Sequence, residues 1–210
     1  AGPQALACMQ PFAPTSSIPS RGFTLIELLV VLSIILLLGG FALHGITKQT
    51  ASQRMDGLQK TFITFLLSAR KAAVMQHVDV IVCPIRTQHR TMSDTSVCGK
   101  RNQWHLGVLA FTDHNRNLKL DANDAVVAQL PGFKNATIRW RAFRNRAYLR
   151  FTAQGLTDWQ NGPFLICGTS AIPELSRQIT LNYAGRLYTA KDRNRDGVYE
   201  NARGETLQCD

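Results

Sequence analysis

One stretch decides how this chain folds: Arg21-Gly22-Phe23-Thr24-Leu25-Ile26-Glu27, which leads into an apolar run that ends at Leu43. The run from Phe23 to Leu43 holds 21 residues, and at about 1.5 Å of rise per residue a helix of that length spans the roughly 30 Å hydrocarbon core of a bilayer. Glu27 is the only ionisable side chain inside it. An acid at membrane depth is costly and usually marks a functional site, so the sequence predicts a transmembrane half-helix over residues 23–45 and a charge partner for Glu27.

The residues around Glu27 supply that partner if the chain is cut between Gly22 and Phe23. The stretch resembles the processing site of type IV prepilins and type II secretion pseudopilins, in which a membrane peptidase cuts after the glycine and N-methylates the new first residue. The resemblance implies that residues 1–22 are a leader and that Glu27 neutralises the N-terminal amine of a neighbouring subunit during assembly. An ordinary signal anchor with a tolerated acid is the alternative, and it explains neither Gly22 nor the apolar residue after it.

Four cysteines follow the predicted cut: Cys83, Cys98, Cys167 and Cys209. An even number without a C-x-x-C pair, in a domain that the resemblance places across the membrane, predicts two disulfides in an oxidising periplasm. Local order favours pairing Cys83 with Cys98 and Cys167 with Cys209, although the sequence leaves three connectivities open. Four free thiols or a metal site would be the alternative, which this spacing does not favour.

The pattern of apolar residues predicts that the helix continues beyond the membrane segment. Positions spaced by three and four form one apolar face: Met55, Leu58, Phe62, Phe65, Leu66, Ala69 and Ala73. The polar residues fall mostly on the other face: Gln53, Arg54, Asp56, Gln59, Lys60, Arg70 and Lys71. Such an apolar face needs a sheet to cover it.

From Val78 onward the apolar period changes from 3.6 to 2, and turn residues recur at short intervals. Eight strands are predicted, at Val78–Cys83, Trp104–Phe111, Ala125–Leu130, Thr137–Phe143, Ala147–Thr152, Phe164–Cys167, Ile179–Tyr183 and Arg186–Thr189. One long helix followed by many short strands predicts an α+β, pilin-like fold, in which a long N-terminal helix, half of it transmembrane, packs on antiparallel β-sheet. The periplasmic globular domain is expected to cover residues 46–210.

Four short motifs narrow the resemblance to the GspH/FimT family. They are Leu66-Leu67-Ser68-Ala69-Arg70 before a strand, the Phe111-Thr112-Asp113 loop with its Asn and Asp residues, the Phe151-Thr152-Ala153-Gln154-Gly155 turn, and the late Gly185-Arg186 pair. Each is less specific than the N-terminal motif, but together they extend over essentially the whole chain after the cut. The resemblance implies a minor pilin of a type IV pilus or a minor pseudopilin of a type II secretion system. The two expected disulfides and the basic surface favour the pilus.

Two loops are rich in Asn and Asp. In the first, Asp113, Asn115, Asn117, Asp121 and Asp124 take the first, third, fifth, ninth and twelfth places of an EF-hand-like loop, but Leu118 stands where such a loop needs glycine. The second starts with Asp192, Asn194, Asp196 and Gly197, yet has Arg203 at its twelfth place. Asx-rich turns between strands explain both loops without calcium. We therefore predict no metal site and no cofactor.

The basic residues gather in two groups, in a chain whose formal net charge is +10. The first group is Arg139, Arg141, Arg144, Arg146 and Arg150, interleaved with Trp140, Phe143 and Tyr148, and the second is Arg186, Lys191, Arg193 and Arg195. If the strands at Thr137–Phe143 and Ala147–Thr152 pair, alternation puts Arg139 and Arg141 on one face, with Arg144 and Arg146 near the connecting turn. Trp140 lies on the opposite face and should point into the core.

DNA is a candidate partner for these groups. Some pilins of the family bind DNA during natural transformation through a late Gly-Arg-x-Arg run, which this chain matches at Gly185 and Arg186 and departs from at Tyr188. A solvated face, or a surface complementary to acidic neighbouring pilins, is the alternative interpretation. A DNA-binding minor pilin is therefore the third functional hypothesis, after the pilus subunit and the secretion pseudopilin.

The sequence contains no pattern that predicts an enzyme. The five histidines stand apart, and no nucleophile elbow, phosphate-cradling loop or metal-ligand cluster is present. The expected partners are other major and minor pilins or pseudopilins, prepilin peptidase and an inner-membrane assembly platform. The resemblance places the chain in the inner membrane, as a single-pass protein with a periplasmic domain, before assembly, and in the pilus or pseudopilus afterwards.

Overall fold

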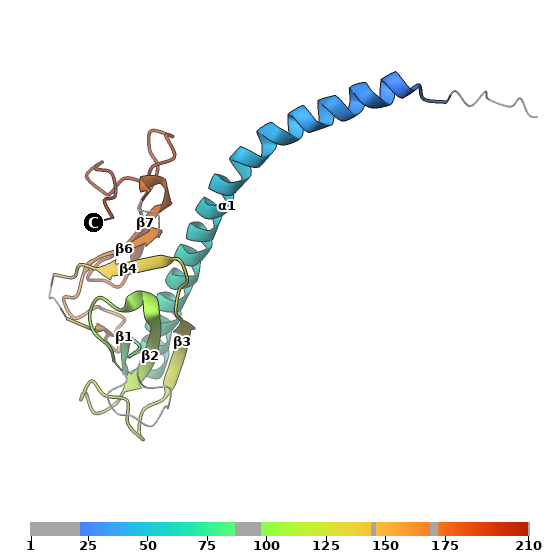
Figure 1. Ribbon diagram of the computed structural model, residues 1–210. Coiled ribbons are helices and arrows are strands. Elements are labelled where there is room, and N and C mark those ends of the chain that lie inside the picture. The colour runs from blue at the N-terminus through green and yellow to red at the C-terminus, as the bar shows by residue number, and fades with distance from the viewer. Residues whose placement is uncertain (1–21, 87–97, 144–145, 169–171, 210) are drawn as a thin grey trace, which may run out of the picture. The chain divides into compact units, whose positions relative to one another are not determined.

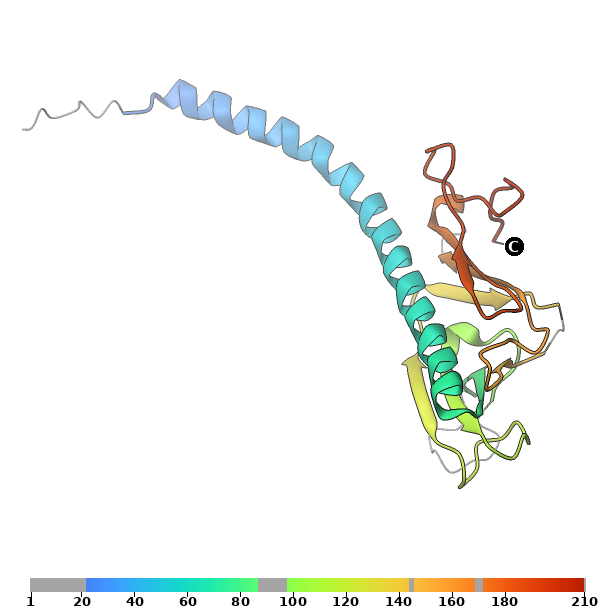
Figure 2. The same ribbon diagram turned by 180° about the vertical axis from the view of Figure 1, so that it is seen from behind.

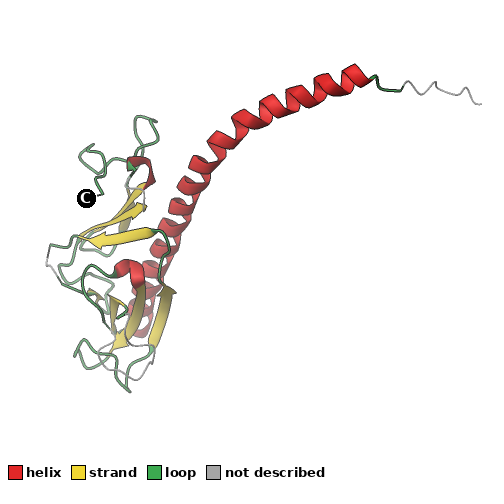
Figure 3. Cartoon of the chain, in the orientation of Figure 1, coloured by secondary structure: helices red, strands yellow, loops and turns green. Residues whose placement is uncertain are grey.

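The computed structural model describes residues 22–86, 98–143, 146–168 and 172–209, without the side chains of residues 39 and 41–48. Arg144, residues 1–21 of the predicted leader and part of the predicted transmembrane segment lie outside this description. The chain divides into two compact units, Ala1–Gly45 and Ile46–Asp210, and each is considered by itself. Figure 3 shows one long helix followed by short strands and loops, which confirms the predicted α+β class.

The described elements follow one another along the chain. They are α1 (Leu25–Gln76), β1 (Asp79–Pro84), the 3-10 helix η1 (Trp104–Leu106), β2 (Gly107–Asp113), β3 (Val126–Pro131), β4 (Ala136–Trp140), β5 (Leu149–Phe151), β6 (Gly162–Gly168), the 3-10 helix η2 (Pro173–Leu175), β7 (Ser176–Leu181) and β8 (Leu187–Thr189). The helix ends because His77 takes a left-handed conformation (φ 53°), from which the Val78 N–H reaches the Ala73 carbonyl at 3.2 Å. This turn leads directly into β1.

The predicted apolar face of α1 is buried in the second unit, as the spacing of three and four requires. Its most buried members are Met55, Phe62, Phe65, Leu66, Ala69 and Ala73. The predicted polar face is wrong at Gln59, which is buried and donates to the Gln178 carbonyl at 3.1 Å. Asp56 and Arg70 also bond to residues of the strands and loops and do not point freely into solvent.

Two four-stranded antiparallel sheets cover the helix. The strand order is β3-β2-β1-β5 in the first sheet and β4-β6-β7-β8 in the second. The chain therefore leaves the first sheet after β3, forms an edge of the second with β4, returns for β5, and then completes the second sheet. Figures 1 and 2 show the part of α1 that belongs to the second unit lying against both sheets.

Each predicted strand has a counterpart in the structure, but two details of the prediction are wrong. Trp104–Leu106 forms η1 and not the start of a strand. The strands that carry Arg139 and Arg150 do not pair, because β4 pairs with β6 whereas β5 pairs with β1. Trp140, at the end of β4, stacks on Phe164 of β6 with ring centroids 5.1 Å apart, and this packing holds β4 in the second sheet.

A single core joins the two sheets to α1. Its buried residues come from α1, from β1, β2 and β5 of the first sheet, and from β4, β6 and β7 of the second. Phe62 of α1 lies edge-on to Phe164 with 5.2 Å between ring centroids, and Trp104 lies at the same distance from Phe164. The aromatic contacts centred on Phe164 therefore tie η1 and the second sheet to the helix.

Two smaller clusters contain the disulfides, one for each sheet. Cys83 is bonded to Cys98 beside Ile81, Leu109 and Phe111 of the first sheet. Cys167 is bonded to Cys209 beside Leu165 and Leu207 of the second sheet. Of the three connectivities that the sequence leaves open, the structure contains the one favoured by local order. The second bond ties the C-terminal segment to β6.

Removing the Cys167–Cys209 bond by a Cys209→Ser substitution should destabilise the domain by about 4 kcal/mol, because the bond closes a segment with a sequence separation of 42 residues. Cys98→Ser is the matched control, with an expected loss of about 3 kcal/mol for a separation of 15 residues. Urea unfolding of the oxidised variants measures both effects. Alkylation of all four thiols in periplasmic, unreduced protein would contradict the structural role of these bonds.

Candidate processing and assembly site

The start of α1 is fixed by a cap. The Glu27 backbone N–H donates to the Thr24 hydroxyl oxygen at 3.3 Å, and the Leu28 N–H donates to the Thr24 carbonyl at 3.2 Å. Thr24 is thus the N-cap residue and Glu27 the third helical residue, the T-x-x-E order of a capping box. Sequence analysis missed the role of Thr24, although this spacing was present. The cap also places the Glu27 carboxylate in the first turn, where the helix dipole favours a negative charge.

Gly22 has no structural role within the described chain. A Cβ atom placed on Gly22 would meet no other atom within 4 Å, and its backbone is outside the left-handed region that favours glycine. The fold would therefore accept a larger residue at this position. A requirement for glycine here has to come from a molecule that contacts the chain at this position.

The segment from residue 23 to residue 38 exposes apolar side chains in every direction. Those with exposed fractions between 46% and 82% are Phe23, Leu25, Ile26, Leu28, Leu29, Val30, Val31, Leu32, Ile34, Ile35, Leu36, Leu37 and Leu38. The one hydroxyl in the middle of this segment is satisfied, since Ser33 donates to the Val30 carbonyl at 2.7 Å. A helix that is apolar on all sides requires lipid or other helices around it.

Within the part of the chain that the structure describes, no helix combines the length and the apolar character that crossing a membrane requires. The predicted span over residues 23–45 includes side chains at positions 39 and 41–45 that lie outside that part. The span remains a prediction.

Arg70 joins three of the motifs that sequence analysis singled out. Its Nε donates to the Gly155 carbonyl at 2.9 Å, and its second terminal nitrogen donates to the Ala184 carbonyl at 3.0 Å. Gly155 and Gly185 both have left-handed backbones, with φ of 75° and 71°. A Cβ atom on Gly185 would collide with the Gly155 carbonyl and with Arg70. These motifs therefore form one packing site that holds two turns against α1.

Arg177 fastens α1 to β7 and was missed by sequence analysis. Its side chain is fully buried, and its Nε donates to the Asp56 carboxylate of α1 at 2.6 Å. The terminal nitrogens donate to the Ser52 hydroxyl at 2.8 Å and to the carbonyls of Glu174 and Ser176 at 2.8 and 2.9 Å. Its guanidinium carbon lies 4.0 Å from the centre of the Tyr199 ring. The buried guanidinium group of Arg177 therefore has a counter-charge, hydrogen-bond acceptors and an aromatic ring around it.

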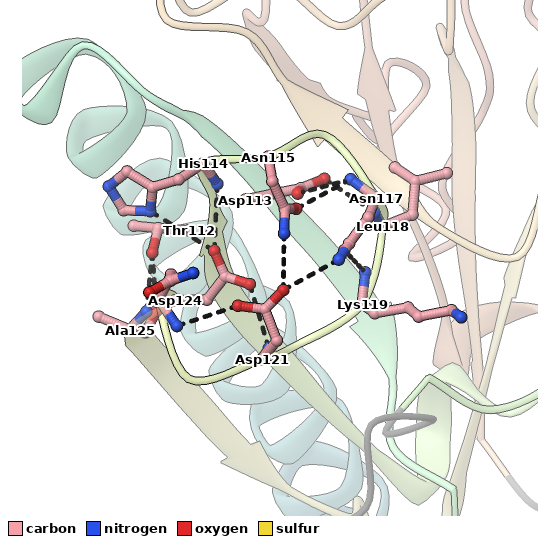
Figure 4. A network of polar contacts seen from close by, with 11 residues as sticks. Thr112, Asp113, His114, Asn115, Asn117, Leu118, Lys119, Asp121, Asp124 and Ala125 are labelled. Atoms are coloured by element: carbon pink, nitrogen blue, oxygen red, sulfur yellow. Dashed lines mark hydrogen bonds and ion pairs between the residues drawn. The ribbon is translucent and has the colours of Figure 1, made fainter.

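The first Asn/Asp-rich loop is held together by its own hydrogen bonds (Figure 4). Asp113 accepts from the N–H groups of Asn117 and Leu118, and Asp121 accepts from the side-chain amides of Asn115 and Asn117. A bond from the Asn123 N–H, and then those from the Asn115 and Asn117 amides, lower the pKa of Asp121. In a calcium-binding loop these side chains would point their oxygen atoms at the ion. Here the side-chain amides of Asn115 and Asn117 instead donate hydrogen bonds to the Asp121 carboxylate. The bonding is that of Asx turns.

The second loop gathers three carboxylates. The side chains of Asp192, Asp196 and Glu200 place oxygen atoms within 4.8 Å of one another. Sequence analysis considered Arg203 as the last residue of this loop and missed Glu200. Asp192 accepts from the Arg195 and Gly197 N–H groups, and Glu200 accepts from the Arg193 N–H. These backbone donors satisfy the carboxylates that a cation would need.

The structure separates the predicted arginines of the first group. Arg146 bonds to the Tyr148 hydroxyl at 2.6 Å and lies 3.8 Å from Asp158, and Arg150 bonds to Asp158 at 2.8 Å. Arg139, in β4, is half-buried, and Arg141 is exposed at the edge of the second sheet. Trp140 between them is buried, as predicted.

Two exposed residues of the second group lie near Arg141. Lys191 and Arg193 line a cavity of about 440 Å³, and Arg141 lines a neighbouring one of about 450 Å³. Gln178 and Asn201 line both cavities, so the two lie side by side over the second sheet. Arg186 and Arg195 are exposed but belong to neither lining.

Two family models match the chain. The model described as type II transport protein GspH matches residues 59–185, and the model of the prokaryotic N-terminal methylation motif matches residues 19–43. The first match contains the Arg70 packing site and most of both sheets, and the second contains Gly22, Phe23 and Glu27. No curated protein matches the chain.

Two solved structures resemble this fold, and both are crystal forms of the type IV minor pilin FimU of Pseudomonas aeruginosa. One is 20% identical, covers 67% of this chain and 85% of its own chain, and has a TM-score of 0.42. The other is 19% identical, covers 68% of this chain and 92% of its own, and has a TM-score of 0.43.

Proposed function

Because the chain belongs to the GspH family of type II transport proteins and also carries the N-terminal methylation motif, we propose that it is a minor pilin of a type IV pilus. Prepilin peptidase would cut after Gly22 and methylate Phe23, and the processed chain would enter the filament or prime its assembly. The broader class is established: the chain is a minor pilin-like subunit of a type IV pilus or of a type II secretion pseudopilus.

The observation that carries the proposal is the apolar surface of residues 23–38, which no described part of its own unit covers. Before assembly, lipid of the inner membrane supplies that cover, with the globular domain in the periplasm. After assembly, the helices of neighbouring subunits supply it. Glu27 then faces the methylated amine of a neighbour, and the pair removes two uncompensated charges from apolar surroundings.

Two features of the chain favour a pilus over a secretion pseudopilus. The two disulfides and the basic surface suit a subunit that is exposed outside the cell. Recovery of the tagged chain in sheared surface pili tests this choice. Recovery only with the secretion apparatus would assign it to the pseudopilus.

A Glu27→Ala substitution should leave membrane insertion intact and reduce incorporation into filaments at least tenfold, because the neighbour's amine loses its counter-charge. Glu27→Gln is the matched control: it keeps the size of the side chain and should fail equally, since the charge is what matters. Immunoblots of sheared filaments and membrane fractions measure both. Filaments that contain the Glu27→Ala chain at the wild-type level would refute the pairing role.

The DNA-binding alternative receives little support from the local charge. Residues 191–200 contain three basic and three acidic side chains, so the loop that carries Lys191, Arg193 and Arg195 is close to neutral. Backbone contacts to duplex DNA require an excess of positive charge and weaken steeply with salt.

We expect the soluble domain, residues 46–210, to bind duplex DNA at low salt without preference for this loop. Substituting Arg186, Lys191, Arg193 and Arg195 together should cost no more affinity than substituting the exposed residues Arg54, Lys60, Lys71 and Lys119. Arg70 is unsuitable for the control set because it holds the fold. Polarisation assays at low and physiological salt measure the difference. A loss confined to the first set would make the chain a DNA receptor.

A further inference from the structure

Two aromatic rings lie together on the surface of the second unit. Trp159 has an exposed fraction of 55% and Tyr183 one of 39%, and their ring centroids are 4.6 Å apart. The other two tryptophans, Trp104 and Trp140, are buried in the core. Trp159 and Tyr183 belong to loops separated in sequence, so the fold itself brings the two rings together at the surface.

The backbone that presents Trp159 is strained and firmly anchored. Asp158 and Trp159 have consecutive left-handed conformations, with φ of 42° and 62°, which are unfavourable for residues other than glycine. Thr157 and Gln160 on either side are fully buried. The Thr157 hydroxyl donates to the Tyr183 carbonyl at 3.2 Å, and the Gln160 amide donates to the Tyr148 carbonyl at 3.0 Å. These buried neighbours hold the strained backbone in place, and the Trp159 indole ring projects from it with more than half of its surface exposed.

The apolar surface extends towards the end of α1. Gly155, in the turn that leads to Thr157, lies against Val74, whose side chain would be only 2.9 Å from a Cβ atom at that glycine. Val74 is 41% exposed, and Leu67, two turns earlier on the same stripe of the helix, is 45% exposed. Arg70 lies between them and joins the turns of Gly155 and Ala184. Trp159, Tyr183, Val74 and Leu67 form what we call the helix-end patch.

We propose that the helix-end patch is the surface through which this chain docks a second subunit of its filament, a protein that offers an apolar socket with an acidic rim. The inference rests on the proposed function. Aromatic side chains and arginine are the residues that dominate the energy of protein interfaces. The rim is basic, because Lys71 and Arg186 are exposed while the nearby Asp158 is already paired with Arg150. Charge complementarity therefore requires acids on the partner.

A protein fits this patch better than a nucleic acid does. The rings of Trp159 and Tyr183 pack on each other, which leaves no slot for a base between them. The aliphatic side chains of Leu67 and Val74 suit the core of a protein interface and offer a nucleic acid neither a hydrogen bond nor a charge. Two nearby cations, Arg70 and Arg150, are engaged with carbonyl and carboxylate oxygens, which leaves Lys71 and Arg186 for the acids of a partner protein.

A Trp159→Gly substitution in the full-length chain tests the proposal, because glycine accepts the left-handed backbone and removes only the ring. We expect at least a tenfold loss of the chain from sheared filaments, with processing and the unfolding midpoint unchanged. Tyr183→Ala should give the same loss. Phe143→Ala is the matched control, since Phe143 is 77% exposed outside the patch and should be dispensable. Wild-type recovery of Trp159→Gly would overturn the proposal.

Photo-cross-linking from position 159, with a benzoylphenylalanine in place of Trp159, identifies the occupant in cells that assemble filaments. We expect a cross-link to another filament subunit at a surface rich in Asp and Glu. Cross-links to nucleic acid, or none in assembled filaments, would overturn the inference while leaving the pilin assignment intact. Absence of the wild-type chain itself from filaments would instead overturn the proposed function.

Discussion

Replacing Asp56 with alanine should destabilise the globular domain by about 3 kcal/mol, although Asp56 is one acid on the surface of a helix. Its partner Arg177 is completely buried, and the substitution leaves that cation without its counter-charge. Breaking a buried pair by removing one member typically costs about 3–5 kcal/mol, and the lower end applies because Asp56 is itself 37% exposed. Urea unfolding of residues 46–210 measures the change.

The variant Asp56→Ala with Arg177→Met is the control for this prediction. Methionine removes the unpaired charge while filling much of the space, so the double variant should be no less stable than Asp56→Ala alone. A loss below about 1 kcal/mol from Asp56→Ala would mean that the hydrogen bonds to Ser52, Glu174 and Ser176 suffice for Arg177.

The burial of Arg177 could not be predicted from the sequence. The period of the apolar residues predicted α1 and a counterpart of each of the eight strands, because each pattern reports locally which side of an element meets the core. A lone arginine in β7 carries no such signal. Its partner Asp56 is 121 positions away, and only the packing of β7 on α1 brings them together.

The pairing of the strands could not be predicted from the sequence for a similar reason. Neighbouring strands in sequence usually pair, which favoured β4 with β5. The stacking of Trp140 on Phe164 and the burial of Leu149 and Phe151 beside β1 place these strands in different sheets. Arg139 therefore lies in the second sheet, whereas Arg150 lies in the first sheet and is paired with Asp158.

A Gly22→Trp substitution should abolish processing and leave the uncut precursor in the inner membrane. Nothing in the described fold opposes a larger side chain at this position, because a Cβ there would meet no atom within 4 Å. The effect therefore has to arise in the peptidase, which must admit the backbone at the cut. Immunoblots separate the precursor from the shorter mature chain.

Thr24→Ala is the matched control for Gly22→Trp. It removes the cap that Thr24 provides to the Glu27 N–H, which typically costs about 1 kcal/mol of helix stability, and should leave cleavage in place. Normal processing of Gly22→Trp would contradict the assignment of the cut. The N-terminal motif could be recognised from the sequence because its residues are consecutive, whereas the helix-end patch depends on contacts between segments that are distant in sequence.

The mass of the N-terminal peptide of the mature chain, isolated from membranes or filaments, shows directly whether this chain is processed as a prepilin. We expect a peptide that begins with N-methylated Phe23 and contains Glu27 as its fifth residue. A mature chain that retains residues before Phe23, begins elsewhere, or carries an unmethylated amine would contradict it.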